Sequence, residues 1–266
     1  MLKERCKECK LNFVFFKKLL YFNRLKSTNI KLYNLMEKGS DSPDVVIAGK
    51  QTEGRGRRDN YWFSPLGGLW MSGILPDVLS NKDITTLNIS CGLACAKACD
   101  AIIRDTGVSN CHILLRWPND IILENKKLGG LLIEVKTEGQ SKKSIILGIG
   151  INVNQKGFPK NLEKSAVSLF MLLKKRVSRK SLMFYILTEL DKMIIYIKEK
   201  GTDGLLQEWK NYSYEVGKKI EISVGNNIKK SGKVLGIGKS GELIIVDSNS
   251  TIIKIFNGYN LKLLDK

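Results

Sequence analysis

The residue types best suited to chemistry gather in Arg116-Trp117-Pro118-Asn119-Asp120 and, after a short polar turn, in Lys127-Leu128-Gly129-Gly130. Apolar stretches at residues 112–115 and 131–135 predict the two strands of a hairpin that turns at residues 124–126. This hairpin brings two cations, a carboxylate and a glycine pair, which lets a backbone approach a ligand closely, to one small region. The alternative is a hairpin with solvated charges at its ends, because a motif alone is only a hypothesis.

A second candidate segment follows the short apolar strand predicted at residues 45–48. It runs from Gln51 to Trp62 and alternates glycine with arginine. Free backbone N–H groups and guanidinium groups both suit phosphate, and Trp62 is a candidate aromatic cover. An RNA-binding Arg/Gly segment looks similar, but such segments usually repeat and this one occurs once.

Two further stretches combine polar residues with predicted secondary structure. Ser27-Thr28-Asn29 precedes a helical pattern at residues 30–36, so Ser27 or Thr28 is a candidate N-cap. The alternative is that these hydroxyls and the helix N-terminus face a polar ligand. A strand predicted at residues 144–154 contains interior glycines, which often mark a close ligand, and ends with Asn152 and Asn154 on one face.

Composition narrows the class of protein. A chain of 266 residues with 43% hydrophobic residues can bury a core in one large domain, or in a large and a small one. We find no apolar run of the roughly 18 residues that a membrane span needs. The run at residues 12–22 is interrupted by Lys17-Lys18 and lacks a cleavage site, so we expect a cytoplasmic protein without membrane association.

The formal net charge of +18 allows a nucleic-acid partner. Because the excess is mostly lysine spread along the chain, a solvated lysine-rich surface is the favoured interpretation. Such a surface would still attract acidic partner proteins.

The cysteines and the single histidine exclude several kinds of site. Cys6 and Cys9 form one CxxC without a second pair, which does not support a zinc ribbon. Three cysteines at 91, 95 and 99 share one helix face, as in a packed core. With His112 alone, in a predicted strand, a Ser-His-Asp triad and an HExxH zinc site are largely excluded. The remaining candidates for chemistry are Lys, Arg and Asp side chains, backbone amides and a bound metal.

The remaining pattern predicts an α+β chain with two folded parts. Helices are expected at residues 84–107, 165–173, 179–200 and 203–212, and strands at 19–25 and 69–75. From about Tyr214, four short strands separated by turns indicate a small SH3-like barrel. We expect an N-terminal extension at 1–20, a catalytic domain at 21–213 and a β-domain at 214–266.

Taken in order, these motifs resemble those of the biotin protein ligases. The resemblance covers roughly residues 20–155 and the small C-terminal domain, and it rests on the ordered set, since each motif alone is weak. It implies a mixed sheet with helices, like that of class II aminoacyl-tRNA synthetases, plus the SH3-like barrel. It also implies a reaction in which biotin and ATP form biotinoyl-5′-AMP, with Mg²⁺, before transfer to a lysine of a biotin carboxyl carrier domain.

The resemblance assigns site residues as well. Implied for biotin are Ser27, Thr28, Asn29, Gln51, Gly54, Arg55, Arg57, Lys127, Gly130, Gly148 and Gly150. Implied for ATP and the adenylate are Arg57, Arg58, Trp62, Arg116, Asn119, Asp120, Lys127 and Asn152. Lys127, Arg57 and Asp120 would be catalytic, and Asp120 would lie near Mg²⁺ or the incoming lysine.

Two departures and two alternatives accompany the resemblance. Asp59-Asn60 stands where many relatives carry a further basic residue. Residues 1–20 are too short for the winged helix-turn-helix of repressor forms, so we expect a monofunctional enzyme without specific DNA binding, while a homodimer is allowed. The alternatives are a lipoate or octanoate ligase, although its Arg-Arg-x-Ser-Gly-Gly motif is not seen, and a basic nucleic-acid-binding protein.

Overall fold

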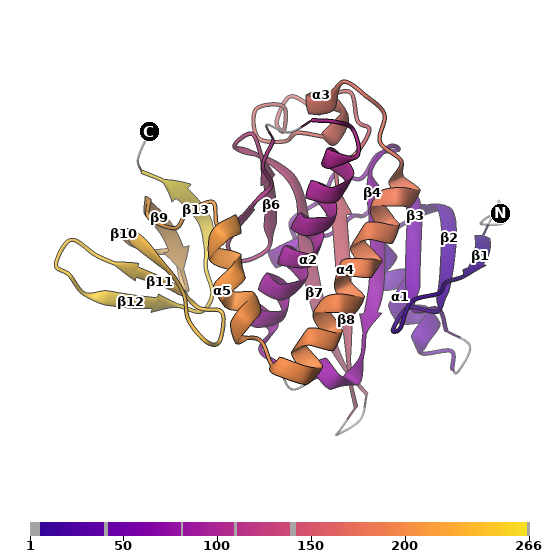
Figure 1. The fold of residues 1–266 in the computed structure, drawn as a ribbon, viewed down its shortest axis with the longest axis horizontal. Helices are drawn as coiled ribbons and strands as arrows, with labels where there is room; N and C mark the ends of the chain where they lie inside the picture. Colours follow the sequence, from indigo (N-terminus) through magenta and orange to yellow (C-terminus); the bar gives the residue numbers. More distant parts are fainter. Residues whose placement is uncertain (1–5, 40–41, 81, 109–110, 139–141, 265–266) are drawn as a thin grey trace.

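An eight-stranded mixed sheet is the centre of the molecule in a computed structural model that describes residues 6–39, 42–80, 82–108, 111–138 and 142–264 (Figure 1). Its strands are β1 (Cys6–Lys10), β2 (Lys18–Leu25), β3 (Val45–Gln51), β4 (Leu69–Leu75), β5 (Leu114–Arg116), β6 (Asp120–Leu123), β7 (Lys126–Glu138) and β8 (Lys142–Ile151). The spatial order is β1-β2-β3-β4-β8-β7-β6-β5. The pairing of β2 with β3 is parallel, because helix α1 (Thr28–Met36) crosses over between them, and the other pairings are antiparallel.

Helices cover both faces of this sheet. In Figure 1, α2 (Ile84–Arg104), α4 (Arg179–Lys200) and α5 (Asp203–Tyr212) lie in front of it. The helix α1 packs against a separate small apolar cluster around Leu32 and Val46. By length and composition α2 could cross a membrane, but 83% of its apolar window is buried, including Cys91, Cys95 and Cys99. It is therefore a core helix, and the prediction of a packed cysteine face is confirmed.

The segment before β2 is part of the sheet rather than a separate piece. Strand β1 pairs with β2, and the following loop is held by the buried Asp191 carboxylate of α4, which accepts the backbone N–H groups of Val14 and Phe15 at 2.5 and 3.2 Å. Phe16 is fully buried. Residues 1–5 of the predicted extension lie outside the described residues. The described part, residues 6–20, contains no helix.

The predicted hairpin is instead a three-stranded meander. Arg116–Asp120 forms the turn between β5 and β6, and β6 then joins β7 through Glu124 and Asn125, which have φ values of 49° and 58°. A positive φ at both central residues matches the twist of a tight hairpin. The strand prediction for residues 112–115 was wrong at its start, because β5 begins at Leu114 and leaves His112 exposed outside the strand.

The helix predicted at residues 165–173 is also wrong in its first half. Only α3 (Leu169–Leu173) is helical there. The preceding residues lie alongside β7: Lys127 N–H donates to Ser165 O at 2.8 Å, and Val167 N–H donates to Lys127 O at 3.1 Å. These two bonds take the backbone groups that a helix would need.

The C-terminal part is a five-stranded antiparallel sheet with the order β12-β11-β10-β9-β13. Its strands are β9 (Lys219–Val224), β10 (Ile228–Ile237), β11 (Leu243–Val246), β12 (Ile252–Ile255) and β13 (Tyr259–Leu263). The small β-domain is confirmed, although the sequence did not predict β13. The domain boundaries stay predictions, and residues 265–266 lie outside the described residues.

The β5–β6 turn is locked into this C-terminal sheet. Trp117, only 3% exposed, donates its indole N–H to Gly241 O at 2.9 Å. Its backbone N–H donates at 2.5 Å to Glu215, a fully buried carboxylate in the linker between the domains. Tyr214 N–H donates to Leu115 O at 2.9 Å, so the linker also pairs with β5. The two domains are therefore joined by hydrogen bonds at the central motif.

Burial raises the pKa of Glu215 to about 7, although Trp117 N–H, the Arg116 charge and Ser213 favour its charged form. The native state then retains a proton that the unfolded chain releases near pH 4.5, so this group's stabilisation is present at low pH and is lost as pH rises towards 7. The loss amounts to about 3 kcal/mol at most. We expect Glu215→Gln, whose amide oxygen can still accept from Trp117, to abolish this slope and to be more stable than the parent at pH 8.

Urea unfolding of parent and variant between pH 5 and 8 measures this effect. The control is Glu163→Gln, which changes an exposed glutamate and should keep the parental slope. Parallel stability curves for the parent and Glu215→Gln would contradict the prediction.

Candidate active site

The predicted site residues meet in one cavity of about 660 Å³. The predicted residues that line it are Ser27, Thr28, Asn29, Gln51, Arg55, Arg57, Arg58, Trp62, Arg116, Asn119, Asp120, Lys127, Gly130, Gly148, Gly150 and Asn152. Gly54 is not among the lining residues. A Cβ at Gly54 would collide with Trp62 O and Ser64 Oγ, so this glycine permits the loop's fold instead.

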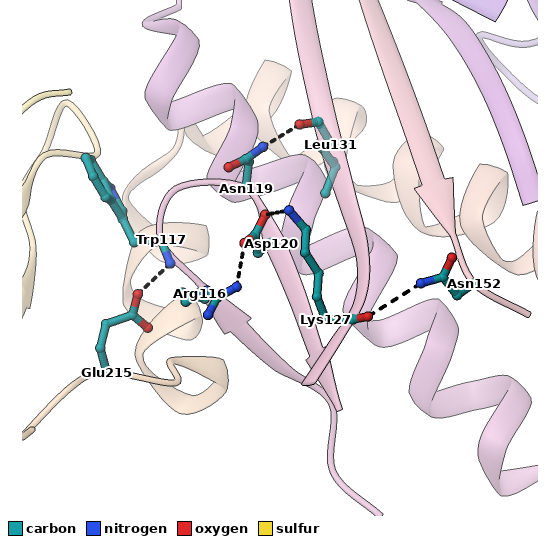
Figure 2. Close-up of polar contacts among 8 residues, drawn as sticks. All are labelled: Arg116, Trp117, Asn119, Asp120, Lys127, Leu131, Asn152 and Glu215. Carbon is teal, nitrogen blue, oxygen red and sulfur yellow. Dashed lines mark hydrogen bonds and ion pairs between the residues drawn. The ribbon is translucent and has the colours of Figure 1, made fainter. Parts of the chain in front are cut away.

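A half-buried carboxylate between two cations forms the centre of the cavity wall. Figure 2 shows Lys127 and Arg116 pointing at Asp120, with Nζ–Oδ1 at 2.6 Å and Nη2–Oδ2 at 2.9 Å. Burial by itself raises the pKa of Asp120, but the two cations and their hydrogen bonds outweigh it, so the pKa lies below its usual value. The site therefore holds a fixed anion and two fixed cations at neutral pH.

Backbone bonds position the lysine and two asparagines around it. Lys127 is held by Ser165 and Val167, as described above, and Asn152 Nδ2 donates to its carbonyl at 3.5 Å (Figure 2). The Asn119 side chain donates to Leu131 O at 2.6 Å, which ties the β5–β6 turn to β7. The strands therefore set where the charged groups lie.

The glycine-arginine loop reaches across to the C-terminal sheet. Arg57 Nη2 donates to Asn257 Oδ1 at 2.9 Å, and the Arg58 guanidinium lies 3.6 Å from the centre of the Tyr259 ring. Burial lowers the pKa of Arg57, Asp120 opposes this and Arg58 adds to it, but a guanidinium stays charged. Arg58 itself has a φ of 57°, a left-handed conformation unusual for a side chain of this size.

At the other end, the cavity is polar but not basic. Thr28 N–H donates to Gln51 Oε1 at 2.8 Å, and Gln51 Nε2 donates to Ser64 Oγ at 2.9 Å. Ser27 occupies the N-cap position of α1 but its side chain makes no capping hydrogen bond. The predicted N-cap position is therefore confirmed for Ser27, but it is the Gln51 side chain that accepts Thr28 N–H at this helix terminus.

Two glycines of β8 allow large side chains to lie against the strand. A Cβ at Gly150 would lie 2.5 Å from Trp62 Nε1, and one at Gly148 would collide with Asn29 Oδ1. Trp62 Nε1 is buried without a hydrogen-bond partner in the described part of the chain. Trp62 therefore packs on Gly150, with Lys127 Nζ 5.0 Å from its ring centre.

The residues around Asp120 do not fit a preformed Mg²⁺ site. Both carboxylate oxygens are engaged by cations, and no group of three His, Cys, Asp or Glu side chains in the described ranges could hold a metal. Mg²⁺ usually keeps several waters and binds through one or two carboxylates plus substrate phosphates. This arrangement gives no support to Asp120 as a metal ligand.

Some residues near the cavity were not predicted. Glu134 bonds Asn29, Ser72 bonds Asn29 and Thr28, and the C-terminal residues Asn257 and Tyr259 contact the arginine loop. Glu134 had a signal in the sequence, since a carboxylate inside an apolar strand is seldom buried without a partner. No pattern in the sequence predicts the contacts of Asn257 and Tyr259, because these contacts depend on how the two domains pack.

Comparison with known proteins agrees with this geometry. Residues 21–152 match the model of the biotin/lipoate A/B protein ligase family. The structure is similar to that of biotin protein ligase from Aquifex aeolicus in complex with biotin and ATP, with a TM-score of 0.77 and 27% identity, over 92% of this chain and 97% of that one.

Two curated relatives extend the match along the chain. The bifunctional ligase/repressor BirA of Bacillus subtilis is 33% identical over 244 residues, which cover 90% of this chain and 72% of that protein. The biotin–[acetyl-CoA-carboxylase] ligase of Mycobacterium tuberculosis is 26% identical, over 85% of this chain and 82% of that protein. Sequence, fold and cavity agree: this chain belongs to the biotin protein ligase family.

Proposed function

We propose that this chain condenses biotin with ATP to biotinoyl-5′-AMP and then transfers the biotinoyl group to a lysine of a biotin carboxyl carrier domain. One observation carries the proposal: a single cavity joins a neutral polar end at Thr28 and Gln51 to a cationic centre at Lys127, Arg116 and Arg57. The first end suits the uncharged head of an acyl substrate. The second suits a carboxylate and a phosphate.

In the first step, the biotin carboxylate attacks the α-phosphorus of ATP and pyrophosphate leaves. Two anions must approach each other, so the barrier falls where fixed cations face the developing charge. Lys127 and Arg116 are preorganised by Asp120, and Arg57 adds a third cation from the loop. The paired ends of β5, β6 and β7 place Arg116, Asp120 and Lys127 close together.

In the second step, a neutral lysine amine of the carrier attacks the acyl carbon and AMP leaves with the electron pair of the broken anhydride bond. Asp120 lies in the wall at this centre. Because its pKa lies below the usual value, it is a weak base. Its role is then to orient the amine, while the released proton passes to water or to the departing phosphate.

The substrate class is tested by ATP–pyrophosphate exchange with biotin, lipoate and octanoate supplied separately. Exchange that depends on biotin supports the proposal. Exchange with lipoate or octanoate instead would assign the chain to the alternative reaction of the same fold.

The nucleic-acid alternative and the remaining partner predictions need separate measurements. Filter binding to DNA across a salt titration should give weak binding that falls steeply with salt, as spread positive charge produces. A site-selective footprint at physiological salt would contradict the expected lack of specific DNA binding. The cytoplasmic location and a homodimer stay predictions.

We expect Lys127→Ala to slow adenylation about 100-fold or more, the usual scale for losing one preorganised charge stabiliser. Pyrophosphate exchange at saturating substrates measures this rate. The matched control is Lys126→Ala, the neighbouring lysine of the same strand, whose amine makes an exposed contact with Glu163 O at 3.5 Å. A rate for Lys127→Ala within a few-fold of the parent would show that the assignment is wrong.

We expect Arg57→Gly to release biotinoyl-AMP and to label bystander proteins. The substitution removes a cation and its bond to Asn257, and adds backbone freedom to the loop. Losing one charge-assisted contact costs about 1.5–3 kcal/mol, roughly 10- to 150-fold in retention. Incubation with ATP, biotin and serum albumin, followed by a biotin blot, measures the leak.

Asn257→Ala separates the loss of the cation from the loss of its hydrogen bond, because Arg57 stays in place but loses its partner in the C-terminal domain. Labelling by this variant should lie between that of the parent and that of Arg57→Gly. If Arg57→Gly still makes adenylate but labels no more albumin than the parent, Arg57 does not retain the intermediate.

A further inference from the structure

A relay of hydrogen-bonded side chains runs behind the neutral end of the cavity. Asn29 Nδ2 donates to Glu134 Oε2 at 2.7 Å, and Ser72 Oγ lies 2.5 Å from Asn29 Oδ1. Ser72 Oγ also lies 2.7 Å from Thr28 Oγ1. Thr28 and Asn29 line the cavity, whereas Ser72 and Glu134 are not among its lining residues.

The types of these groups fix the direction of the relay. A carboxylate only accepts, so the Asn29 amide must turn its Nδ2 to Glu134 and its oxygen to Ser72. Asn29 Oδ1 also only accepts, so the Ser72 hydroxyl must donate its single proton to Asn29. Ser72 can then only accept from Thr28, and the Thr28 hydroxyl proton points away from the cavity towards Ser72.

The consequence is a pair of acceptors at the cavity wall. The Thr28 hydroxyl has a second acceptor within reach, Gln51 Oε1 at 3.1 Å, but its contact with Ser72 is shorter, at 2.7 Å, and takes the proton. Thr28 Oγ1 then keeps its lone pairs for a ligand. The Gln51 amide is fixed in the same sense, because its oxygen takes Thr28 N–H and its nitrogen donates to Ser64. Two oxygens facing the cavity without protons of their own are complementary to N–H donors.

Two neighbours hold Glu134 and Asn29 in place. Arg55 Nη2 lies 3.4 Å from Glu134 Oε1, so the glycine-arginine loop also contacts the carboxylate at this point of β7. Gly148 leaves room for the Asn29 amide against β8, where any Cβ would collide with it. The relay is therefore built into two strands and one helix terminus.

We propose that Glu134 is a positioning residue that selects the acyl substrate by setting the direction of this relay. It keeps the Thr28 end of the cavity an acceptor, which favours an acyl substrate with ring N–H donors, such as the cyclic urea of biotin, over a purely apolar acyl chain. This inference rests on the proposed function. Without the carboxylate the Asn29 amide can turn over, and Thr28 can then point its proton into the cavity against the substrate N–H.

The test compares Glu134→Leu and Glu134→Gln in pyrophosphate exchange. Leucine has no acceptor, so KM for biotin should rise about 10-fold or more, since an unmet polar group in a site is costly. KM for ATP should stay within about 3-fold. Glutamine offers an amide oxygen to Asn29 and should restore KM for biotin to within about 3-fold of the parent. Desthiobiotin, which keeps the cyclic urea, should behave as biotin does.

Ser72→Ala interrupts the relay at its middle without touching Glu134, and it carries the test if Glu134→Leu does not fold. It should also raise KM for biotin selectively. A parental KM in both variants would overturn the proposal. Equal damage from Gln and Leu would overturn it too, since the contact with Arg55 would then be what matters. Failure of the proposed function is recognised separately, because the parent itself would then show no biotin-dependent exchange.

Discussion

The ion cluster at Asp120 is the interaction on which the rest of the site depends. One carboxylate holds Lys127 and Arg116 at hydrogen-bond distance in a partly buried wall, where charges interact more strongly than in water. A charge that loses contact with water and has no partner destabilises the fold. Asp120, Lys127 and Arg116 therefore have to lie next to one another. The register of the sheet does this: Asp120 pairs with Arg116 across β5–β6 and with Gly130 across β6–β7.

The same turn makes the second domain part of the site. Trp117, which lies between Arg116 and Asp120, is anchored by Gly241 and Glu215, so the turn cannot move without disturbing the C-terminal sheet. That sheet in turn contacts the arginine loop through Asn257 and Tyr259. The hydroxyl of Tyr259 also bonds Asn227 in the turn between β9 and β10. Both edges of the cavity therefore depend on how the domains pack.

How well the sequence predicts this site depends on how far apart in the chain the contacting residues are. The motif residues came together as expected because short turns and strand ends carry them. The relay through Glu134 and Ser72 could not be derived. The carboxylate of Glu134 signals only that it needs a partner, and the relay joins residues that are 105 and 43 positions apart in the sequence. The helix predicted before Leu169 failed for a similar reason: its apolar spacing was real, but the backbone of Lys127 competes for the same hydrogen bonds.

The cations of the cavity differ in how firmly the folded chain holds them. Lys127 and Arg116 are fixed by short bonds to a carboxylate with only 17% of its side chain exposed, and such bonds are costly to break. Arg55 instead has longer contacts, at 3.3 Å to the exposed Asp59 and 3.4 Å to Glu134, and exposed pairs contribute little. An anionic ligand can therefore draw Arg55 away from Asp59 at low cost, while Lys127 and Arg116 keep their positions. The strand cations and Arg55 therefore differ in how firmly the folded chain holds them.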